Sequence, residues 1–352
     1  MAIVIQIGLL ILGFALLVYG ADFFVDGASR VADRLKIPQI VIGLTIVAFG
    51  TSAPEAAVSI TAGLKGIADL AVSNVVGSNI MNILLILGVS ACIASLPIKK
   101  NTFAIEIPWV IVITVILLVL GINGSVISFV DGLILCGLMA IFMVYLIIQA
   151  KNGESDDEST ELTEKDTMLK LLVFVAIGIV CIVVGSNVTV DAASYVAEKC
   201  GMSSRLIGLT IVAFGTSAPE AGVSIVSSMS GDNALAISNV VGSNLFNMLV
   251  VVGCCALIRN VSVDKDIKHR DMPICLGVTL LLFIFVMNLI LSRIEGVFLF
   301  ILIIGYVVML VSVALKEIKE AEQHPDDEVE KMVVYPKFRI FLSFIGVVLG
   351  VF

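Results

Sequence analysis

Two glutamates end the same short motif, Gly-Thr-Ser-Ala-Pro-Glu, at Glu55 and again at Glu220, each within an apolar stretch. A carboxylate inside a membrane-spanning segment is costly, so it is by default a functional-site hypothesis. Two carboxylates held close together repel each other, and a divalent cation between them would remove that repulsion. Oxygen ligands with no His or Cys nearby favour hard cations such as Ca²⁺, Mg²⁺ or Na⁺ over zinc or copper. The pair therefore predicts a hard-cation site.

Hydroxyl and amide side chains near the two glutamates offer further oxygen ligands. Ca²⁺ takes roughly 6–8 oxygens in flexible geometry, whereas Mg²⁺ keeps several waters and demands a stricter octahedron, so Ca²⁺ fits better. Hydrogen bonding between helices is the competing interpretation of the Ser and Asn residues, and a structural capping pair is that of the glutamates. The candidate side chains beyond the glutamates are Thr51, Thr216, Ser52, Ser217, Ser78, Asn82, Ser243 and Asn247.

The motif belongs to an internal repeat. IGLTIVAFGTSAPEA spans Ile42 to Ala56 and recurs unchanged from Ile207, and SNVVGSN spans Ser73 to Asn79 and recurs from Ser238. Both pairs are displaced by the same 165 residues. Chance does not produce such identity at one constant offset, so the chain is predicted to be a duplicated unit.

The elements that position these residues are predicted to be membrane helices. The chain of 352 residues is 59% hydrophobic and only 14% charged, against about 25% charged in an average soluble domain, which excludes a water-soluble globule. At about 20 residues per spanning helix, ten candidate spans are found, five in each copy of the unit. They fall near residues 2–20, 37–60, 67–95, 103–120, 126–149, 168–186, 202–229, 233–258, 271–291 and 294–315.

An odd number of crossings per unit has a geometric consequence. The second copy must enter the membrane from the opposite side, which gives inverted repeats with a site at the midplane where they meet. We therefore expect an all-α, multi-pass integral protein of the cell (plasma) membrane, made of two inverted five-helix repeats.

A break in the second helix of each repeat is expected at the Gly-Thr-Ser-Ala-Pro motif. Ser and Thr are preferred at helix N-caps, and Pro is tolerated in a first turn, so each helix is expected to stop near the midplane and restart at Pro54 or Pro219. Irregular backbone at that depth must be buried or line a cavity. Each glutamate then lies in a first turn, where the helix dipole favours its charged form.

Composition also divides the chain and excludes some partners. We expect repeats over 1–150 and 168–317, an acidic linker over 151–167, and a charged stretch with a short apolar tail over 318–352 that could form an eleventh segment. The net charge of −8 and the lack of a basic patch argue against nucleic acid. The seven cysteines show no metal-type spacing and are expected to pack as small apolar residues.

The paired GTSAPE and SNVVGSN blocks closely resemble those of the cation/calcium antiporter superfamily, and within it the sodium/calcium exchanger branch with its prokaryotic members. The resemblance covers both five-helix units. It implies exchange of Na⁺ for Ca²⁺ by alternating access across the lipid bilayer, without enzymatic activity or a cofactor. It also implies that Glu55, Glu220, Thr51 and Thr216 bind Ca²⁺. The Na⁺ ligands that it implies are Ser52, Ser217, Ser78, Ser243 and the backbone carbonyls of Ala48 and Ala213.

The choice of counter-ion has alternatives. Potassium-dependent relatives, and some prokaryotic members, carry Asp where this chain has Asn247, and proton-coupled calcium exchangers carry GNxxE in place of GTSAPE. The potassium-dependent and proton-coupled branches therefore resemble the chain less. A cation channel that uses the same oxygens is the alternative from another class. For a carrier, two glutamates give a charge of about −2, which one Ca²⁺ or several Na⁺ ions would balance at overlapping sites. The first helix of each repeat is the expected moving part.

Overall fold

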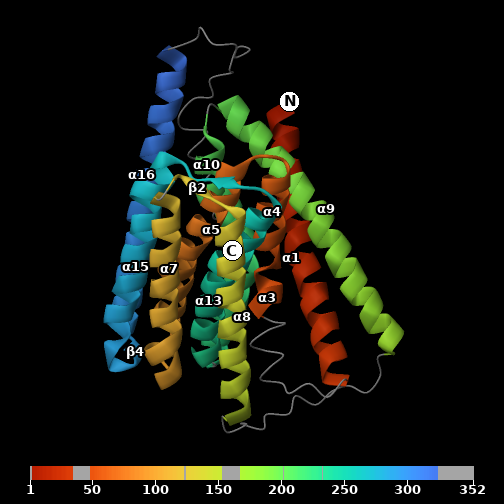
Figure 1. The fold of residues 1–352 in the computed structure, drawn as a ribbon, viewed down its shortest axis with the longest axis vertical. Coiled ribbons are helices and arrows are strands. Elements are labelled where there is room, and N and C mark those ends of the chain that lie inside the picture. The colour runs from red at the N-terminus through yellow and green to blue at the C-terminus, as the bar shows by residue number, and fades with distance from the viewer. Residues whose placement is uncertain are drawn as a thin grey trace.

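The computed structural model describes residues 2–34, 48–122, 124–152, 167–200, 202–231 and 233–323, and these are mostly helical (Figure 1). Most of the expected acidic linker and the whole expected eleventh segment lie outside the described residues. The same is true of the first part of the second predicted span, before Ala48. Predictions for those parts of the chain stay predictions.

Where both are described, the two repeats contain nearly the same succession of elements. The first comprises α1 (Ala2–Arg34), α3 (Ala48–Thr51), α4 (Ala53–Leu64), α5 (Ala68–Met81), a π-helical turn η2 (Asn82–Leu87), α6 (Gly88–Ile93), β1 (Leu96–Pro97), η3 (Thr102–Glu106), α7 (Ile107–Ile122), β2 (Val126–Ile127) and α8 (Phe129–Asn152). The second comprises α9 (Met168–Cys200), α10 (Ser204–Ile207), η4 (Gly208–Val212), α11 (Ala213–Thr216), α12 (Ala218–Ser230), α13 (Asn233–Phe246), η5 (Asn247–Val251), α14 (Val252–Ile258), β3 (Val261–Ser262), η6 (Ile267–Asp271), α15 (Met272–Phe285), η7 (Val286–Asn288), β4 (Ile290–Leu291) and α16 (Arg293–Gln323).

Most of the predicted spans are present as helices. Within the described residues, eight helices are long and apolar enough to cross a membrane, and a ninth span is bent by 47° between Thr216 and Ala218. The span that starts near residue 37 is described only over α3 and α4. The helices therefore agree with the predicted membrane architecture wherever the chain is described.

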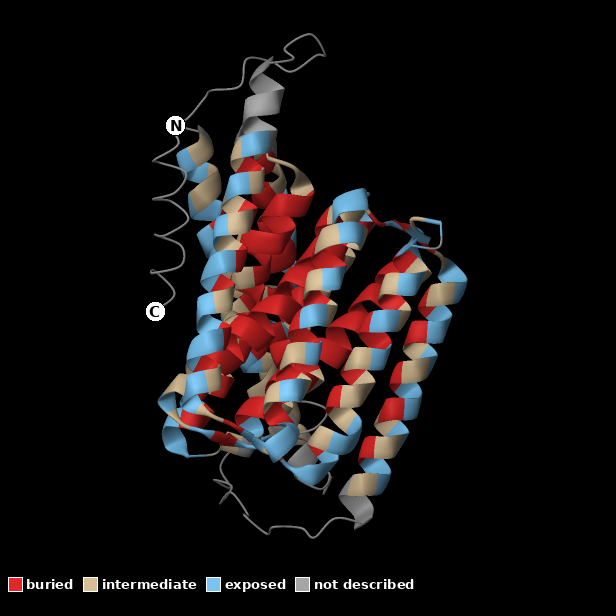
Figure 2. Ribbon diagram, turned by 90° about the vertical axis from the view of Figure 1, so that its left-hand side faces the viewer, coloured by how far each residue is buried: buried red, intermediate tan, exposed pale blue. Residues whose placement is uncertain are grey.

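Two equivalent spans form the centre of the bundle. Of the span Ala68–Ile93, 78% is buried, and of its counterpart Leu235–Ile258, 72%, whereas only 22% of Ile3–Ala28 is buried. Figure 2 shows the buried residues gathered in the middle, with exposed faces on the surrounding helices. Helices that are apolar on all sides suit a lipid-facing position. The small and polar residues of SNVVGSN consequently lie in the protein interior.

The first helices of the two repeats, α1 and α9, run side by side along one flank (Figure 1). Their glycines allow close backbone approach: a Cβ added at Gly178 would lie 2.6 Å from the backbone nitrogen of Phe24 and 2.8 Å from the carbonyl oxygen of Gly20. Small residues at helix interfaces have this role in membranes. The two helices thus pack as a pair beside the rest of the bundle.

Short antiparallel strands, which the sequence patterns do not predict, join the two repeats. Leu96 pairs with Leu291 between β1 and β4, and Ile127 pairs with Val261 between β2 and β3. The 165-residue offset exchanges one strand pair with the other, and the two pairs lie at opposite ends of the molecule (Figure 1). An axis in the membrane plane produces this arrangement, so the repeats are inverted.

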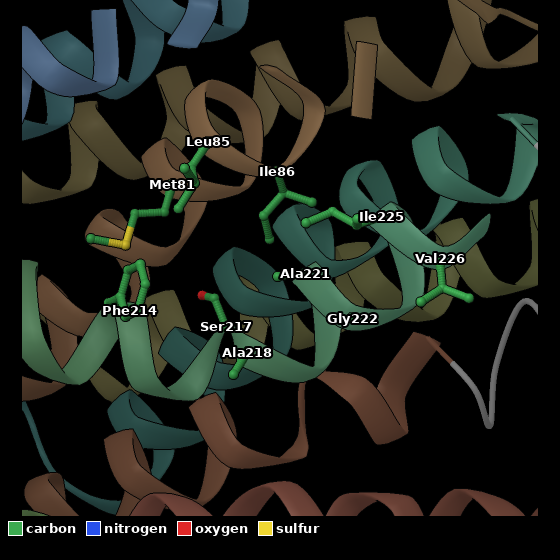
Figure 3. Close-up of a pocket in the computed structure, with 10 residues that line it drawn as sticks. All are labelled: Met81, Leu85, Ile86, Phe214, Ser217, Ala218, Ala221, Gly222, Ile225 and Val226. Atoms are coloured by element: carbon green, nitrogen blue, oxygen red, sulfur yellow. The ribbon is translucent and has the colours of Figure 1, made fainter. Parts of the chain in front are cut away.

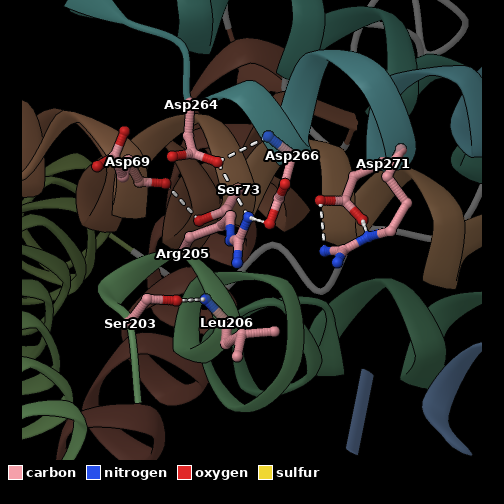
Figure 4. Close-up of polar contacts among 9 residues, drawn as sticks. Asp69, Ser73, Ser203, Arg205, Leu206, Asp264, Asp266 and Asp271 are labelled. Atoms are coloured by element: carbon pink, nitrogen blue, oxygen red, sulfur yellow. Dashed lines mark hydrogen bonds and ion pairs between the residues drawn. The ribbon is translucent and has the colours of Figure 1, made fainter. Parts of the chain in front are cut away.

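The end of the molecule near β3 carries a charge cluster (Figure 4). The guanidinium of Arg205, whose side chain is 7% exposed, donates to Asp264 at 2.9 Å and also to Asp266. The hydrogen bond from Arg205 is the main cause that lowers the pKa of Asp266 below its ordinary value. The first repeat has Lys99 and Asn101 where the second has these two acids, so the two ends of the molecule differ in charge.

Candidate ion-binding site

The predicted helix break is present in both repeats. In the first, α3 ends at Thr51 and α4 begins at Ala53, and Ser52 between them has φ −86° and ψ 5°. The equivalent break in the second repeat falls at Ser217, with φ −80° and ψ 6°. Each proline is therefore the second residue of a new helix, where its missing N–H is tolerated. Each glutamate lies in the first turn of that helix.

Ser52 and Ser217 stand at the N-cap positions of the restarted helices, as predicted, but their side chains do not make the capping hydrogen bond expected there. The hydroxyl of Ser52 instead donates to Oε1 of Glu220 at 2.9 Å, and the hydroxyl of Ser217 donates to Oε1 of Glu55 at 3.0 Å. A carboxylate is a stronger acceptor than a neutral group. Inversion brings each serine to the glutamate of the opposite repeat, and the two broken helices are thereby linked.

Each glutamate is fully buried and uses one oxygen for hydrogen bonds. Oε1 of Glu55 accepts from Ser217 and, at 3.2 Å, from Ser78 of its own repeat. Oε1 of Glu220 accepts in the same way from Ser52 and, at 3.2 Å, from Ser243. The second oxygen, Oε2, is buried without a hydrogen-bond partner in both residues.

Two asparagines add unpartnered oxygens to the same cluster. Nδ2 of Asn82 donates to the Ser243 hydroxyl at 3.1 Å, and Nδ2 of Asn247 donates to the Ser78 hydroxyl at 3.3 Å. Their Oδ1 atoms are buried and have no partner. Each asparagine begins a π-helical turn, η2 or η5, a feature frequent at functional sites. Four acceptor oxygens, equivalent in pairs, are thus left without donors.

The charge of the cluster is uncompensated. Among the described residues, the buried charged side chains are Glu55, Glu220, Arg205 and Asp271. Arg205 is paired as described above, and Asp271 lies 2.8 Å from Arg270. The side-chain hydrogen bonds of the two glutamates come from serine hydroxyls. Because buried charges are normally paired or bound to a metal, two negative charges with unpartnered oxygens form a suitable cation site.

The threonine hydroxyls of the motif donate hydrogen bonds to two asparagines that were not among the predicted ligands. Oγ1 of Thr216 donates to Oδ1 of Asn74 at 3.3 Å, and Oγ1 of Thr51 donates to Oδ1 of Asn239 at 3.3 Å. Nδ2 of Asn74 donates to the Ser59 hydroxyl at 3.0 Å and to the backbone oxygen of Glu55. Asn74 and Asn239 stand in the repeated SNVVGSN block, and this repetition was the signal that could have identified them.

The resemblance also implies the backbone carbonyl oxygens of Ala48 and Ala213 as ligands, and contacts are described for that of Ala213. The carbonyl oxygen of Ala213 accepts the backbone N–H of Ser217 at 3.1 Å and the hydroxyl of Thr216 at 3.3 Å. Ala48 is the first described residue after a gap, and its side chain is not described. These contacts place Ala213 one helical turn before the break.

A cavity of about 200 Å³ lies beside the site on one side (Figure 3). Its lining is mostly apolar and includes Ser217, together with Met81 and Phe214. At the equivalent place in the other half, Phe246 stands where Met81 would, and its ring lies against Phe49 with centroids 4.7 Å apart. The two halves therefore differ in sequence at this place.

The fold and the site together define a two-repeat membrane transporter with paired broken helices around buried carboxylates. A family model described as sodium/calcium exchanger protein matches residues 5–148 and 170–312, and the chain belongs to this family. It is thus a multi-pass integral membrane protein that exchanges Ca²⁺ and another cation, and not an enzyme.

Named relatives and a solved structure agree with this assignment. The chain is 36% identical over 311 residues to the putative antiporter CaxA of Alkalimonas amylolytica, which covers 86% of this chain and 97% of that protein. It is 29% identical over 342 residues to the sodium/calcium exchanger MaX1 of Methanosarcina acetivorans, with the same two shares. The sodium-calcium exchanger NCX_Mj, soaked with 10 mM Na⁺ and 10 mM Sr²⁺, matches with a TM-score of 0.63 and 30% identity, over 87% of this chain and 98% of that one.

Proposed function

We propose that the protein exchanges Na⁺ for Ca²⁺ across the membrane by alternating access, with both ions bound at overlapping sites between Glu55 and Glu220. The four buried oxygens without donors, two of them on carboxylates, are the observation that carries this proposal. Ca²⁺ takes roughly 6–8 oxygens in flexible geometry. The proposed ligand set is Glu55, Glu220, Thr51, Thr216, Ser52, Ser217, Ser78, Ser243, Asn82, Asn247 and the backbone oxygens of Ala48 and Ala213.

Charge balance explains why a bound cation would allow the protein to change between its inward-facing and outward-facing conformations. The site has a charge of about −2 when both glutamates are ionised, and either one Ca²⁺ or Na⁺ ions that share the same oxygens would cancel it. An empty site would retain uncompensated charge in the interior, which is costly. Loaded states would therefore interconvert between the two facing conformations more readily than the empty state, and exchange is enforced.

The moving parts follow from the packing. We assign the repeats to residues 1–150 and 168–317, and their first helices, α1 and α9, form the close pair on one flank. We infer that this pair slides past the buried core. The cavity beside Ser217 supports a path to the site from one side. Inverted repeats allow such a site to open to one side at a time.

Na⁺ is the proposed counter-ion for two reasons. The curated relative MaX1 is named a sodium/calcium exchanger and matches over 86% of the chain. The human sodium/potassium/calcium exchanger 4 matches over only 42%. In addition, the position that carries Asp in potassium-dependent relatives is occupied here by the neutral Asn247.

The test is Ca²⁺ uptake into liposomes that contain the purified protein and an entrapped Ca²⁺ indicator. We expect uptake when Na⁺ is inside and absent outside, efflux when the Na⁺ gradient is reversed, and little movement with K⁺ or choline in place of Na⁺. Uptake driven by a pH gradient without Na⁺ would instead establish proton coupling, and an absolute K⁺ requirement would establish the potassium-dependent mode. Flux without any counter-ion at channel rates would contradict exchange.

A further inference from the structure

Two more asparagines of the repeated block, Asn79 and Asn244, contact each other at the centre of the bundle. Nδ2 of Asn79 donates to the backbone oxygen of Asn244 at 3.3 Å, and Nδ2 of Asn244 donates to the backbone oxygen of Asn79 at 3.4 Å. Reciprocal contacts between equivalent residues are what a two-fold axis produces. Both side chains are buried, with 1% and 2% exposed, so the axis of the inverted repeats passes through this pair.

The backbone oxygens determine which way these two carboxamides face. A carbonyl oxygen only accepts hydrogen bonds, so the atom of Asn244 that faces the Asn79 carbonyl must be its NH₂ group. Oδ1 of Asn244 then faces the other way, where it accepts from Nδ2 of Asn82 at 2.9 Å. The same reasoning applied to Asn79 leaves its Oδ1 as the acceptor for Nδ2 of Asn247 at 3.2 Å.

The orientation is passed on to the next pair of side chains. Because Oδ1 of Asn244 is an acceptor, the nearest group of Asn82 must be its NH₂, and its Oδ1 is turned away. That Oδ1 is one of the four buried oxygens without a donor, as is Oδ1 of Asn247. Two backbone carbonyls thereby fix the orientation of four carboxamides.

We propose that Asn79 and Asn244 are positioning residues that hold Asn247 and Asn82 with their carbonyl oxygens toward the bound cation. The proposal rests on the proposed function for the identity of the site. A carboxamide turned by 180° would present an NH₂ group, which repels a cation. Asn79 acts on Asn247 and Asn244 acts on Asn82, so each positioning residue serves the ligand of the opposite repeat.

The test is a double-mutant cycle read by equilibrium binding of ⁴⁵Ca²⁺ to the purified full chain. Asn79→Ala removes the acceptor for Asn247 and the donor to the backbone oxygen of Asn244. It keeps the backbone oxygen of residue 79 that orients Asn244, so of the two proposed ligands Asn247 loses a hydrogen-bond partner, its bond to the Ser78 hydroxyl remaining, and Asn82 keeps its own. We expect a Ca²⁺ dissociation constant about tenfold higher. In an Asn247→Asp background, Asn79→Ala should change the constant less than about threefold, because a carboxylate presents an oxygen in either orientation.

The matched control is Asn79→Ala in an Asn82→Asp background, where the tenfold effect should persist because Asn244 orients residue 82. An equal factor in both Asp backgrounds would overturn the proposal and leave Asn79 a purely structural residue. If Asn79→Ala does not fold, the equivalent test in the other repeat decides in the same way: Asn244→Ala is compared with and without Asn82→Asp. Wild-type protein that binds Ca²⁺ but shows no Na⁺-driven uptake would defeat the proposed function and still allow the cycle to be read.

Discussion

Replacing Glu55 or Glu220 by Gln is expected to lower Na⁺-driven Ca²⁺ uptake at least about 100-fold, because breaking a buried charge pair costs about 3–5 kcal/mol. Gln is nearly isosteric, and its carbonyl oxygen can still accept from the serines that now bond to Oε1. One charge of the site is lost, so bound Ca²⁺ would leave a net positive charge in the interior. The measurement is the initial rate of uptake in liposomes, with thermal unfolding in detergent as the check on folding.

Glu106→Gln is the matched control for this change. Glu106 is half-buried and lies near the start of a membrane-spanning segment, Thr102–Ile122, so the same chemical change is made within a spanning segment but outside the site. Uptake by Glu106→Gln should stay within about twofold of the wild type. Uptake retained by both site variants would remove the glutamates from the mechanism. An equal loss in Glu106→Gln would show that the assay reports general damage.

The sequence identifies the two glutamates because duplication repeats them and because a membrane interior makes carboxylates conspicuous. It also selects Ser78 and Asn82 from their spacing on one helix face, and the structure brings the Ser78 hydroxyl to Glu55. That Ser78 and Asn82 bind an ion stays a prediction. The direction in which a carboxamide faces is set by partners 165 residues away, so spacing within one helix could not indicate Asn79 or Asn244.

The serine at each helix break shows why local rules failed at one point. Ser52 stands in a position that favours an N-cap, and propensity takes account only of neighbouring residues. Inversion of the repeats places the carboxylate of Glu220 within 2.9 Å, and the hydroxyl donates there. A tertiary contact of this kind depends on how the repeats meet, which the sequence of one segment does not contain.

The succession of spanning helices was predictable because bilayer thickness fixes how long an apolar run must be. Their placement within the bundle was harder to predict from hydropathy. The central span Ala68–Ile93 and the more peripheral span Ile267–Asn288 both have a mean hydropathy of 1.9, yet 78% of the first and 39% of the second is buried. What separates them is the content of small residues such as Gly, Ala and Ser, which let helices pack closely. The strands β1 to β4 are two residues long and carry no periodic signal.

The helix α1 also contacts the broken helix of each repeat, at glycines that the motif repeats. A Cβ added at Gly215 would overlap the ring of Phe14, and one added at Gly50 would overlap the side chain of Val25. Both partners belong to α1. Helix α1 therefore lies directly against the segments that hold the proposed ion ligands, and the sliding that we propose would require a surface without side chains at these two points.

Gly215→Ala and Gly50→Ala are accordingly expected to slow exchange by about 10- to 100-fold, since overpacking a tight contact costs about 1–3 kcal/mol. The maximal rate of Na⁺-driven uptake should fall more than the apparent Ca²⁺ affinity, because the added methyl group faces α1 and not the carboxylates. Gly277→Ala is the control on α15, where nothing lies within 4 Å of the added Cβ, and it should change the rate less than about twofold. Phe14→Ala added to Gly215→Ala makes room for the methyl group and should restore much of the rate. If Gly215→Ala behaves like Gly277→Ala, α1 does not move against the broken helix during exchange.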